Sequence, residues 1–236
     1  MQSSNLGYRT WVIAIYLFNL EPKGITSVRL GEYLGIPQST AWHLLHRIRE
    51  SFSTGSPMLR GTVEVDETYV GGKQKNRHGW QRRLHRGDPL TGKRIVVGAV
   101  QRGGGAVFKM VEGNDINTLT RFVERHVAFA STVYTDDHGG YNDLHMSFRH
   151  RTVNHSRRQY VRPGTKIHTN TIESLWATLK RSYIGVHHWW SHKHMQRYLN
   201  AAAGRYNLRQ LPALDRMAAT WRGMEGKRLR YRYLVA

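Results

Sequence analysis

The hydrophobic period of this 236-residue sequence changes near residue 53, and that change limits the possible folds. From about residue 8 to residue 52, apolar residues recur at helical spacing. The stretch "STGSPMLRG" at 53–61 is rich in Ser, Gly and Pro, which is typical of a linker. After it, "TVEVDETYV" alternates apolar and polar residues as a strand does. The sequence therefore predicts a helical unit, a linker and a unit that contains a sheet.

The helical unit has the pattern of a DNA-binding motif. In "LGEYLGIPQSTAWHLLHRIR" a Gly and a Pro within three residues predict a tight turn, and Ser39 or Thr40 is expected to cap the next helix. That helix carries His43 and Arg47 on a basic, polar face. Helix, tight turn and basic helix are typical of a helix-turn-helix, which reads the major groove. We therefore predict a small helix-turn-helix DNA-binding domain at 1–52, with an ordinary helical hairpin as the alternative.

The second unit is predicted to be an α/β domain. Short β-branched runs ("RIVVGAV", "AVFKMVEG", "TVYTD", "RHRTVNH") alternate with helical patterns ("DINTLTRFVERHVAFA", "NTIESLWATLKRSY"). Strands followed by alternating helix and strand favour a mixed sheet with helices packed on it. We assign this α/β domain to 62–210, with a basic insertion at 71–94. Residues 211–236 form a basic C-terminal tail.

The charge of the chain predicts its partner. Thirty-six Lys and Arg against 16 Asp and Glu give a formal net charge of +20. Such an excess favours a polyanion, because neutralising phosphates releases counterions, so we expect double-stranded DNA. Within the insertion, the residues expected to grip its backbone are Lys75, Arg77, Arg82 and Arg83. The longest apolar stretch, 11–20, is too short to cross a bilayer. We therefore expect a cytoplasmic, nucleoid-associated protein that does not associate with a membrane.

The few acids gather on three elements. Asp66 lies with two Glu residues in the strand at 62–70, Asp136 ends the strand "VYTD", and Glu173 is the single acid in 144–214. Carboxylate oxygens are the ligands that hard divalent cations need. Two such ions about 4 Å apart can stabilise the attacking and leaving oxygens of a displacement at a phosphodiester. Three converging carboxylates would therefore suit metal-dependent cleavage of DNA.

Each acid also has a structural explanation. Glu64 and Asp66 could form the exposed face of an edge strand, because side chains two residues apart share a face. Asp136 could begin a turn, a frequent role of Asp. Glu173 lies three residues after Asn170, so "NTIE" matches a capping box. Three such acids together in an acid-poor chain favour a site.

These segments resemble a known family. "VEVDETYVGGK", "VYTDDHGGY", "VNHSRRQYV" and "HTNTIESLWATLKRSYIGVHH" are similar in order and spacing to the DDE transposases of bacterial insertion sequences, in the ISXO-like branch with a VDETYVGGK-type first motif. The resemblance runs from about Leu6 to Asn207. It implies a ribonuclease H-like mixed five-stranded sheet flanked by helices. It also implies that Asp66, Asp136 and Glu173 are the catalytic carboxylates and the metal ligands.

The resemblance also implies chemistry and partners. Mg²⁺ is the expected cofactor, with Mn²⁺ as a substitute, and the DNA partners are the transposon ends and the target. A homo-oligomer is expected in the DNA complex. Lys180 fits the family's cation seven residues after the glutamate, and Arg181 is predicted to contact DNA beside it. Asn170 is a minor rival for Glu173, because related branches carry Asn as the third residue.

The predicted function is therefore a DNA transposase that binds insertion-sequence ends and catalyses metal-dependent phosphodiester hydrolysis and strand transfer. The alternatives are a non-catalytic DNA-binding repressor derived from a transposase and a nonspecific nuclease. Family members commonly carry a Cys-rich zinc ribbon ahead of the helix-turn-helix, whereas this sequence has no Cys.

Overall fold

The computed structural model describes residues 4–72, 78–79, 92–153, 165 and 167–236. Its helices and strands are, in chain order, α1 (Tyr8–Leu20), α2 (Ser27–Leu34), α3 (Gln38–Arg49), η1 (Glu50–Phe52), β1 (Thr62–Gly71), β2 (Lys93–Gln101), β3 (Ala106–Val111), α5 (Ile116–His126), β4 (Thr132–Asp136), η3 (Gly139–Met146), β5 (Arg149–Val153), α6 (Asn170–Ser182), η5 (Tyr183–His187), α7 (His192–Asn207), α8 (Ala213–Gly223) and α9 (Tyr231–Val235).

The five strands form one mixed sheet in the order β3-β2-β1-β4-β5. β1 and β2 are antiparallel, as are β2 and β3, and residues 102–105 form the short turn between β2 and β3. β4 lies parallel to β1 and β5 parallel to β4, and α5 occupies the connection that leads back to β4. This is the predicted ribonuclease H-like sheet, and each β-branched run quoted above contributes a strand.

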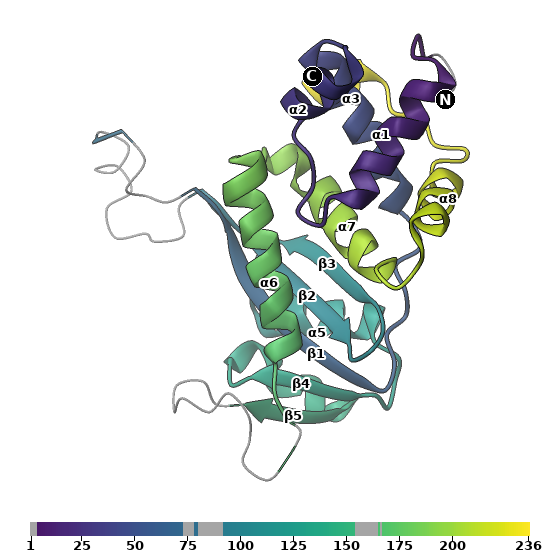
Figure 1. Ribbon diagram of the computed structural model, residues 1–236. Helices are drawn as coiled ribbons and strands as arrows, with labels where there is room; N and C mark the ends of the chain where they lie inside the picture. Colours follow the sequence, from purple (N-terminus) through teal and green to yellow (C-terminus); the bar gives the residue numbers. More distant parts are fainter. Residues whose placement is uncertain (1–3, 73–77, 80–91, 154–164, 166) are drawn as a thin grey trace.

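Helices cover both faces of the sheet (Figure 1). On one face Val63 and Val65 of β1 pack with Leu119 of α5 in one buried cluster. On the other face Val70 packs with Ile172 of α6 and with residues of α7 in a second cluster. Because successive strand residues point to opposite faces, a central strand covered on both sides buries both sets. β1 therefore supplies side chains to both layers.

The N-terminal helices have their own hydrophobic core beside α7 (Figure 1). Between α2 and α3, Gly35 has a φ of 62°, in the left-handed region that glycine adopts without strain. α3 begins at Gln38 directly after Pro37, so the predicted caps Ser39 and Thr40 lie inside the helix. That prediction was wrong because Pro37, with its fixed φ, already sets the helix start.

Residues 211–236 contain two helices, and the first of them joins the N-terminal core. α8 supplies Met217 and Trp221 to the cluster that holds Trp11 of α1, and α7 supplies Ala201. The two ends of the chain therefore pack together at one end of the molecule (Figure 1). The domain boundaries remain predictions. Among the described residues, no helix combines the length and apolar character that crossing a membrane requires.

Candidate active site

The register of the parallel strands brings two aspartates together. Val63 pairs with Val133 and Glu64 with Tyr134, an offset of 70 positions in the sequence. The same offset carries Asp66 to Asp136, the last residue of β4. Parallel strands in this register present matched residues side by side. The sequence could not show this register, which depends on how β4 returns to β1.

A third carboxylate completes the cluster. Single ligand atoms of Asp66, Glu67 and Asp136 all lie within 4.8 Å of one another. The Tyr141 hydroxyl donates a hydrogen bond of 2.6 Å to Glu67 Oε2, and the His138 backbone N–H donates to Asp136 Oδ1 at 3.1 Å. Pairing of β1 with β4 stops at Glu64, so carboxylates from both faces of β1 can turn toward Asp136.

The cluster carries unbalanced negative charge. Burial raises the pKa of Asp66 to about 7, and the charges of Asp136 and Glu67 act in the same direction. Burial also raises the pKa of Glu67, despite the hydrogen bond from Tyr141. Without a cation, the raised pKa values favour protonation of Asp66 and Glu67. A bound cation would instead stabilise their charged forms. Three oxygen donors that repel one another suit a hard divalent ion such as Mg²⁺ or Mn²⁺.

Helix α6 is attached directly to the cluster. The Trp176 indole N–H donates a hydrogen bond of 2.9 Å to Asp66 Oδ2. Asp66 pairs across the sheet with Gly98 of β2. A Cβ added at Gly98 would lie 2.4 Å from the Trp176 ring, so only glycine leaves space for the indole there. The Trp176 ring, seated over Gly98, thus holds one oxygen of Asp66 and sets the orientation of α6.

Glu64 holds the N-terminus of α6. Its side chain is fully buried, and its Oε2 accepts hydrogen bonds from the backbone N–H groups of Thr171 at 2.8 Å and Ile172 at 3.1 Å. Arg102 Nε donates to Oε1 at 2.7 Å. A carboxylate at a helix N-terminus satisfies unpaired N–H groups and interacts favourably with the helix dipole. Glu64 therefore positions α6 on the sheet from the strand that also carries Asp66.

Glu173 lies on α6 one turn before Trp176, outside the three-carboxylate cluster. Its Oε1 accepts a hydrogen bond of 3.0 Å from the Thr169 hydroxyl. Thr169 occupies the N-cap position of α6 and Asn170 is already the first helical residue, so the capping box based on Asn170 was wrong. Asn170 is exposed at the first position of the helix. The catalytic role of Glu173 stays a prediction.

The other structural explanations have different outcomes. β1 is paired on both sides and Glu64 is buried, so the exposed edge strand was wrong. Asp136 does begin a turn through its bond to the His138 N–H, and it also belongs to the cluster. A turn and a ligand role are compatible because the two Asp oxygens can serve different partners.

The predicted DNA contacts lie in three places. His43 and Arg47 on α3 are half-buried against the C-terminal segment. Lys180 and Arg181 are exposed in the last turn of α6. The residues of the basic insertion lie outside the described residues: Lys75, Arg77, Arg82 and Arg83. All of these contacts stay predictions.

Sequence reasoning missed the roles of Glu64 and Glu67. Alternation places Glu67 on the opposite face of β1 from Asp66, so the strand pattern alone does not indicate a shared site. Glu64 gave one signal, because a carboxylate between Val63 and Val65 in an apolar run needs a partner if it is buried. Its partners come from residues 102 and 168–172, which no local pattern connects to it.

The sheet order and the paired aspartates define a ribonuclease H-like protein. The chain belongs to the ISXO2-like transposase family, whose domain model matches residues 58–207. It is 27% identical over 212 residues to an uncharacterized protein in transposable element ISH50 of Halobacterium salinarum, covering 85% of this chain and 70% of that protein.

Two solved structures are also similar. The Mos1 strand transfer complex is 10% identical with a TM-score of 0.37, covering 98% of this chain and 82% of that chain. The Drosophila P element transposase strand transfer complex is 11% identical with a TM-score of 0.33, covering 97% of this chain and 62% of that chain.

Proposed function

We propose that this protein is a metal-dependent DNA transposase that nicks the ends of its insertion sequence and joins them to target DNA. The observation that carries the proposal is the group of Asp66, Glu67 and Asp136 ligand atoms within 4.8 Å, on register-matched strands of a transposase-family domain. In the proposed reaction, water hydrolyses a phosphodiester at the element's end. The freed 3′-hydroxyl then attacks a phosphodiester of the target, with no covalent enzyme intermediate.

The cluster supplies the ligands that such a reaction needs. Divalent ions, when bound, supply Lewis acids that stabilise the attacking and leaving oxygens. Asp66 and Asp136 would hold them, with Glu67 as a third ligand through the oxygen that Tyr141 does not occupy. Glu173 would approach from α6 to complete the carboxylate set.

The surroundings of the cluster control its geometry. The Trp176 bond holds Oδ2 of Asp66, and Glu64 keeps α6 at a fixed place on the sheet. Lys180 and Arg181, near the other end of α6, would contact the DNA backbone. We further propose that α2 and α3 form a helix-turn-helix that reads the element's ends, and that the enzyme acts as a homo-oligomer on DNA.

Nicking of supercoiled plasmid tests the proposal. Purified protein with Mg²⁺ or Mn²⁺ should convert supercoiled plasmid to open circles, and EDTA should stop the conversion. Asp66→Asn and Asp136→Asn should abolish nicking while gel-shift binding stays intact or tightens, because each removes a metal ligand and a negative charge.

Asp137→Asn is the matched control, since this neighbour is exposed and outside the cluster, and it should retain most of the activity. Binding without nicking by the unmodified protein would support the repressor instead. Full nicking by either cluster variant would refute the assignment of the site.

A further inference from the structure

The C-terminal segment lies along the predicted recognition helix. The His43 ring Nε2 is 3.1 Å from the Leu229 carbonyl oxygen, and the rings of His43 and Tyr231 are 5.5 Å apart between centroids. Lys227 Nζ donates to the Glu50 carbonyl at 2.8 Å, just beyond the C-terminus of α3. A cation there interacts favourably with the helix dipole and unpaired carbonyls. Residues 227–235, here called the arm, are thus fixed to α3 by several contacts.

The two sides of the arm differ in chemistry. Its inner side holds Leu234, which is 3% exposed, and the half-buried Leu229. Its outer side exposes Arg228, Arg230 and Arg232, and the arm contains no acid. Alternate positions of an extended segment face opposite ways, so Arg228 and Arg230 share one side. Leu234 anchors the arm, and the three arginines face solvent together with Tyr231, Tyr233 and Val235.

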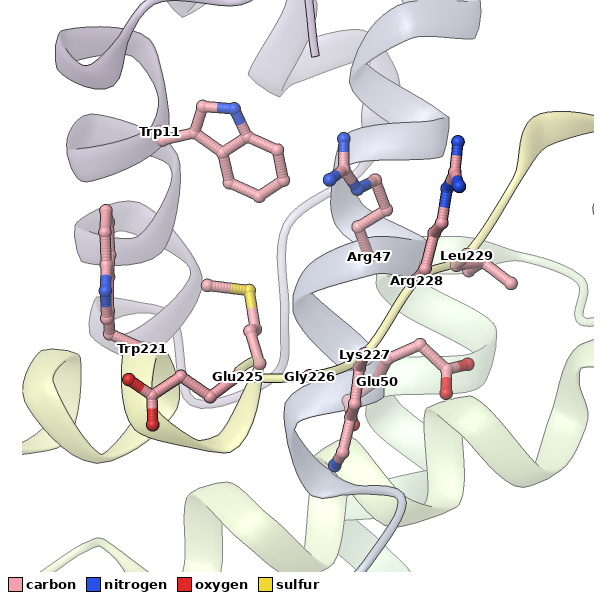
Figure 2. A pocket seen from close by; sticks show the side chains of 10 residues that line it. Trp11, Arg47, Glu50, Trp221, Glu225, Gly226, Lys227, Arg228 and Leu229 are labelled. Carbon is pink, nitrogen blue, oxygen red and sulfur yellow. The ribbon is translucent and has the colours of Figure 1, made fainter. Parts of the chain in front are cut away.

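The arm also adds charge to α3 where the helix is already basic. Arg47 of α3 and Arg228 of the arm extend in the same direction at the rim of a cavity of about 260 Å³ (Figure 2). Arg47 lies 4.7 Å above the Trp11 ring, which holds its guanidinium in place. Burial lowers the pKa of Arg47, and the Arg228 charge acts in the same direction. Two adjacent cations of this kind are stabilised by an anion placed over both.

The first part of α3 is the part most open to a partner. Gln38 and Ser39 are exposed, whereas no residue from Ala41 to Glu50 is, and the structure describes all of them. In helix-turn-helix proteins the N-terminal residues of the second helix contact base edges. A duplex that meets this end of α3 would run past the arm.

We propose that the arm and α3 form one DNA-binding surface, in which α3 meets base edges and Arg228, Arg230 and Arg232 grip backbone phosphates beside it. The proposal rests on the proposed function only in taking duplex DNA as the partner. Charge complementarity favours DNA, because the exposed face of the arm is cationic and lacks acids.

The arm can be tested by binding to a labelled duplex of unrelated sequence at several salt concentrations. Arg230→Ala with Arg232→Ala should make the slope of log affinity against log salt shallower by about 2, from two phosphate contacts at about −0.9 each. With equal affinities at 1 M salt, the same relation gives a loss of affinity of roughly 60-fold at 0.1 M salt. Lys at both positions should restore most of the slope, since charge rather than shape is required.

The matched control is Arg121→Ala with Arg125→Ala, which removes two exposed arginines from α5. This helix covers the sheet face opposite α6 and α7, so the slope should stay unchanged. An unchanged slope in the arm variant would overturn the proposal. Tighter binding would overturn it as well and would identify the arm as a cover over α3. Mg²⁺-dependent nicking at saturating protein, measured on the same preparations, tests the proposed function separately.

Discussion

Asp66→Asn should stabilise the metal-free protein, because the native site buries a carboxylate among like charges. The pKa of Asp66 is about 7 in the folded chain and 3.8 ordinarily. At about 1.4 kcal/mol per pKa unit, this difference corresponds to about 4 kcal/mol of destabilisation at pH 8. Asn keeps an oxygen that can accept the Trp176 N–H at 2.9 Å, so most of this cost should be recovered. We expect a gain of about 2 to 4 kcal/mol.

The sign of the pH dependence follows from the raised pKa. A group whose folded pKa is raised favours folding at low pH, and this contribution is lost as the pH rises from about 4 to about 7. The advantage of Asp66→Asn should therefore be small at pH 4, grow to pH 7 and stay constant above it. Urea denaturation in EDTA at several pH values measures this difference.

Excess Mg²⁺ supplies the complementary measurement. An ion that binds only the folded state raises stability by mass action, so Mg²⁺ at pH 8 should stabilise the native protein and not Asp66→Asn. Asp137→Asn, at the exposed neighbour of the cluster, should behave like the native protein. A pH-independent gain, a loss of stability, or equal stabilisation of both proteins by Mg²⁺ would refute the reasoning.

Three further predictions concern other parts of the chain. Glu64→Gln should cost about 3 kcal/mol in urea denaturation and reduce nicking, because it breaks a buried ion pair that holds α6; normal values for both would contradict this role. Burial lowers the pKa of His46 to about 2, so the native protein loses stability as the pH falls below 6.5. Between pH 7.5 and pH 5, the free energy of unfolding of His46→Phe should therefore rise by about 2 kcal/mol relative to that of the native protein. The same urea denaturation measures this difference. Ala replacement of four residues of the basic insertion should make the slope of log affinity against log salt concentration shallower by roughly 3 to 4, while the preference for element ends is kept. These residues are Lys75, Arg77, Arg82 and Arg83.

The fold was predictable because its signals are local. β-branched runs fixed the five strands, and the apolar spacing of "NTIESLWATLKRSY" fixed α6. Asp66 and Asp136 were identifiable as site candidates because acids are few in this chain. Their proximity depends on the offset between β1 and β4, which became an expectation only through the family resemblance.

The remaining features depend on long-range contacts. For Glu64 the sequence offered an exposed edge strand as the structural explanation, because nothing near it in the sequence indicates Arg102 or the N-terminus of α6. Glu67 was not predicted as a site residue, and alternation alone does not indicate where the pairing of β1 with β4 stops. The attachment of the arm to α3 joins residues almost 190 positions apart, and such contacts leave no periodic signal.

Mapping the nicks on a plasmid tests the central claim most directly. The substrate is a supercoiled plasmid that carries this gene with its native flanking DNA, in which terminal inverted repeats are to be located, incubated with the protein and Mg²⁺. The 5′ ends at each nick are located by primer extension. The account predicts nicks at the outer boundaries of the repeats that disappear with Asp136→Asn. Nicks scattered over the plasmid, or boundary nicks that persist in that variant, would contradict it.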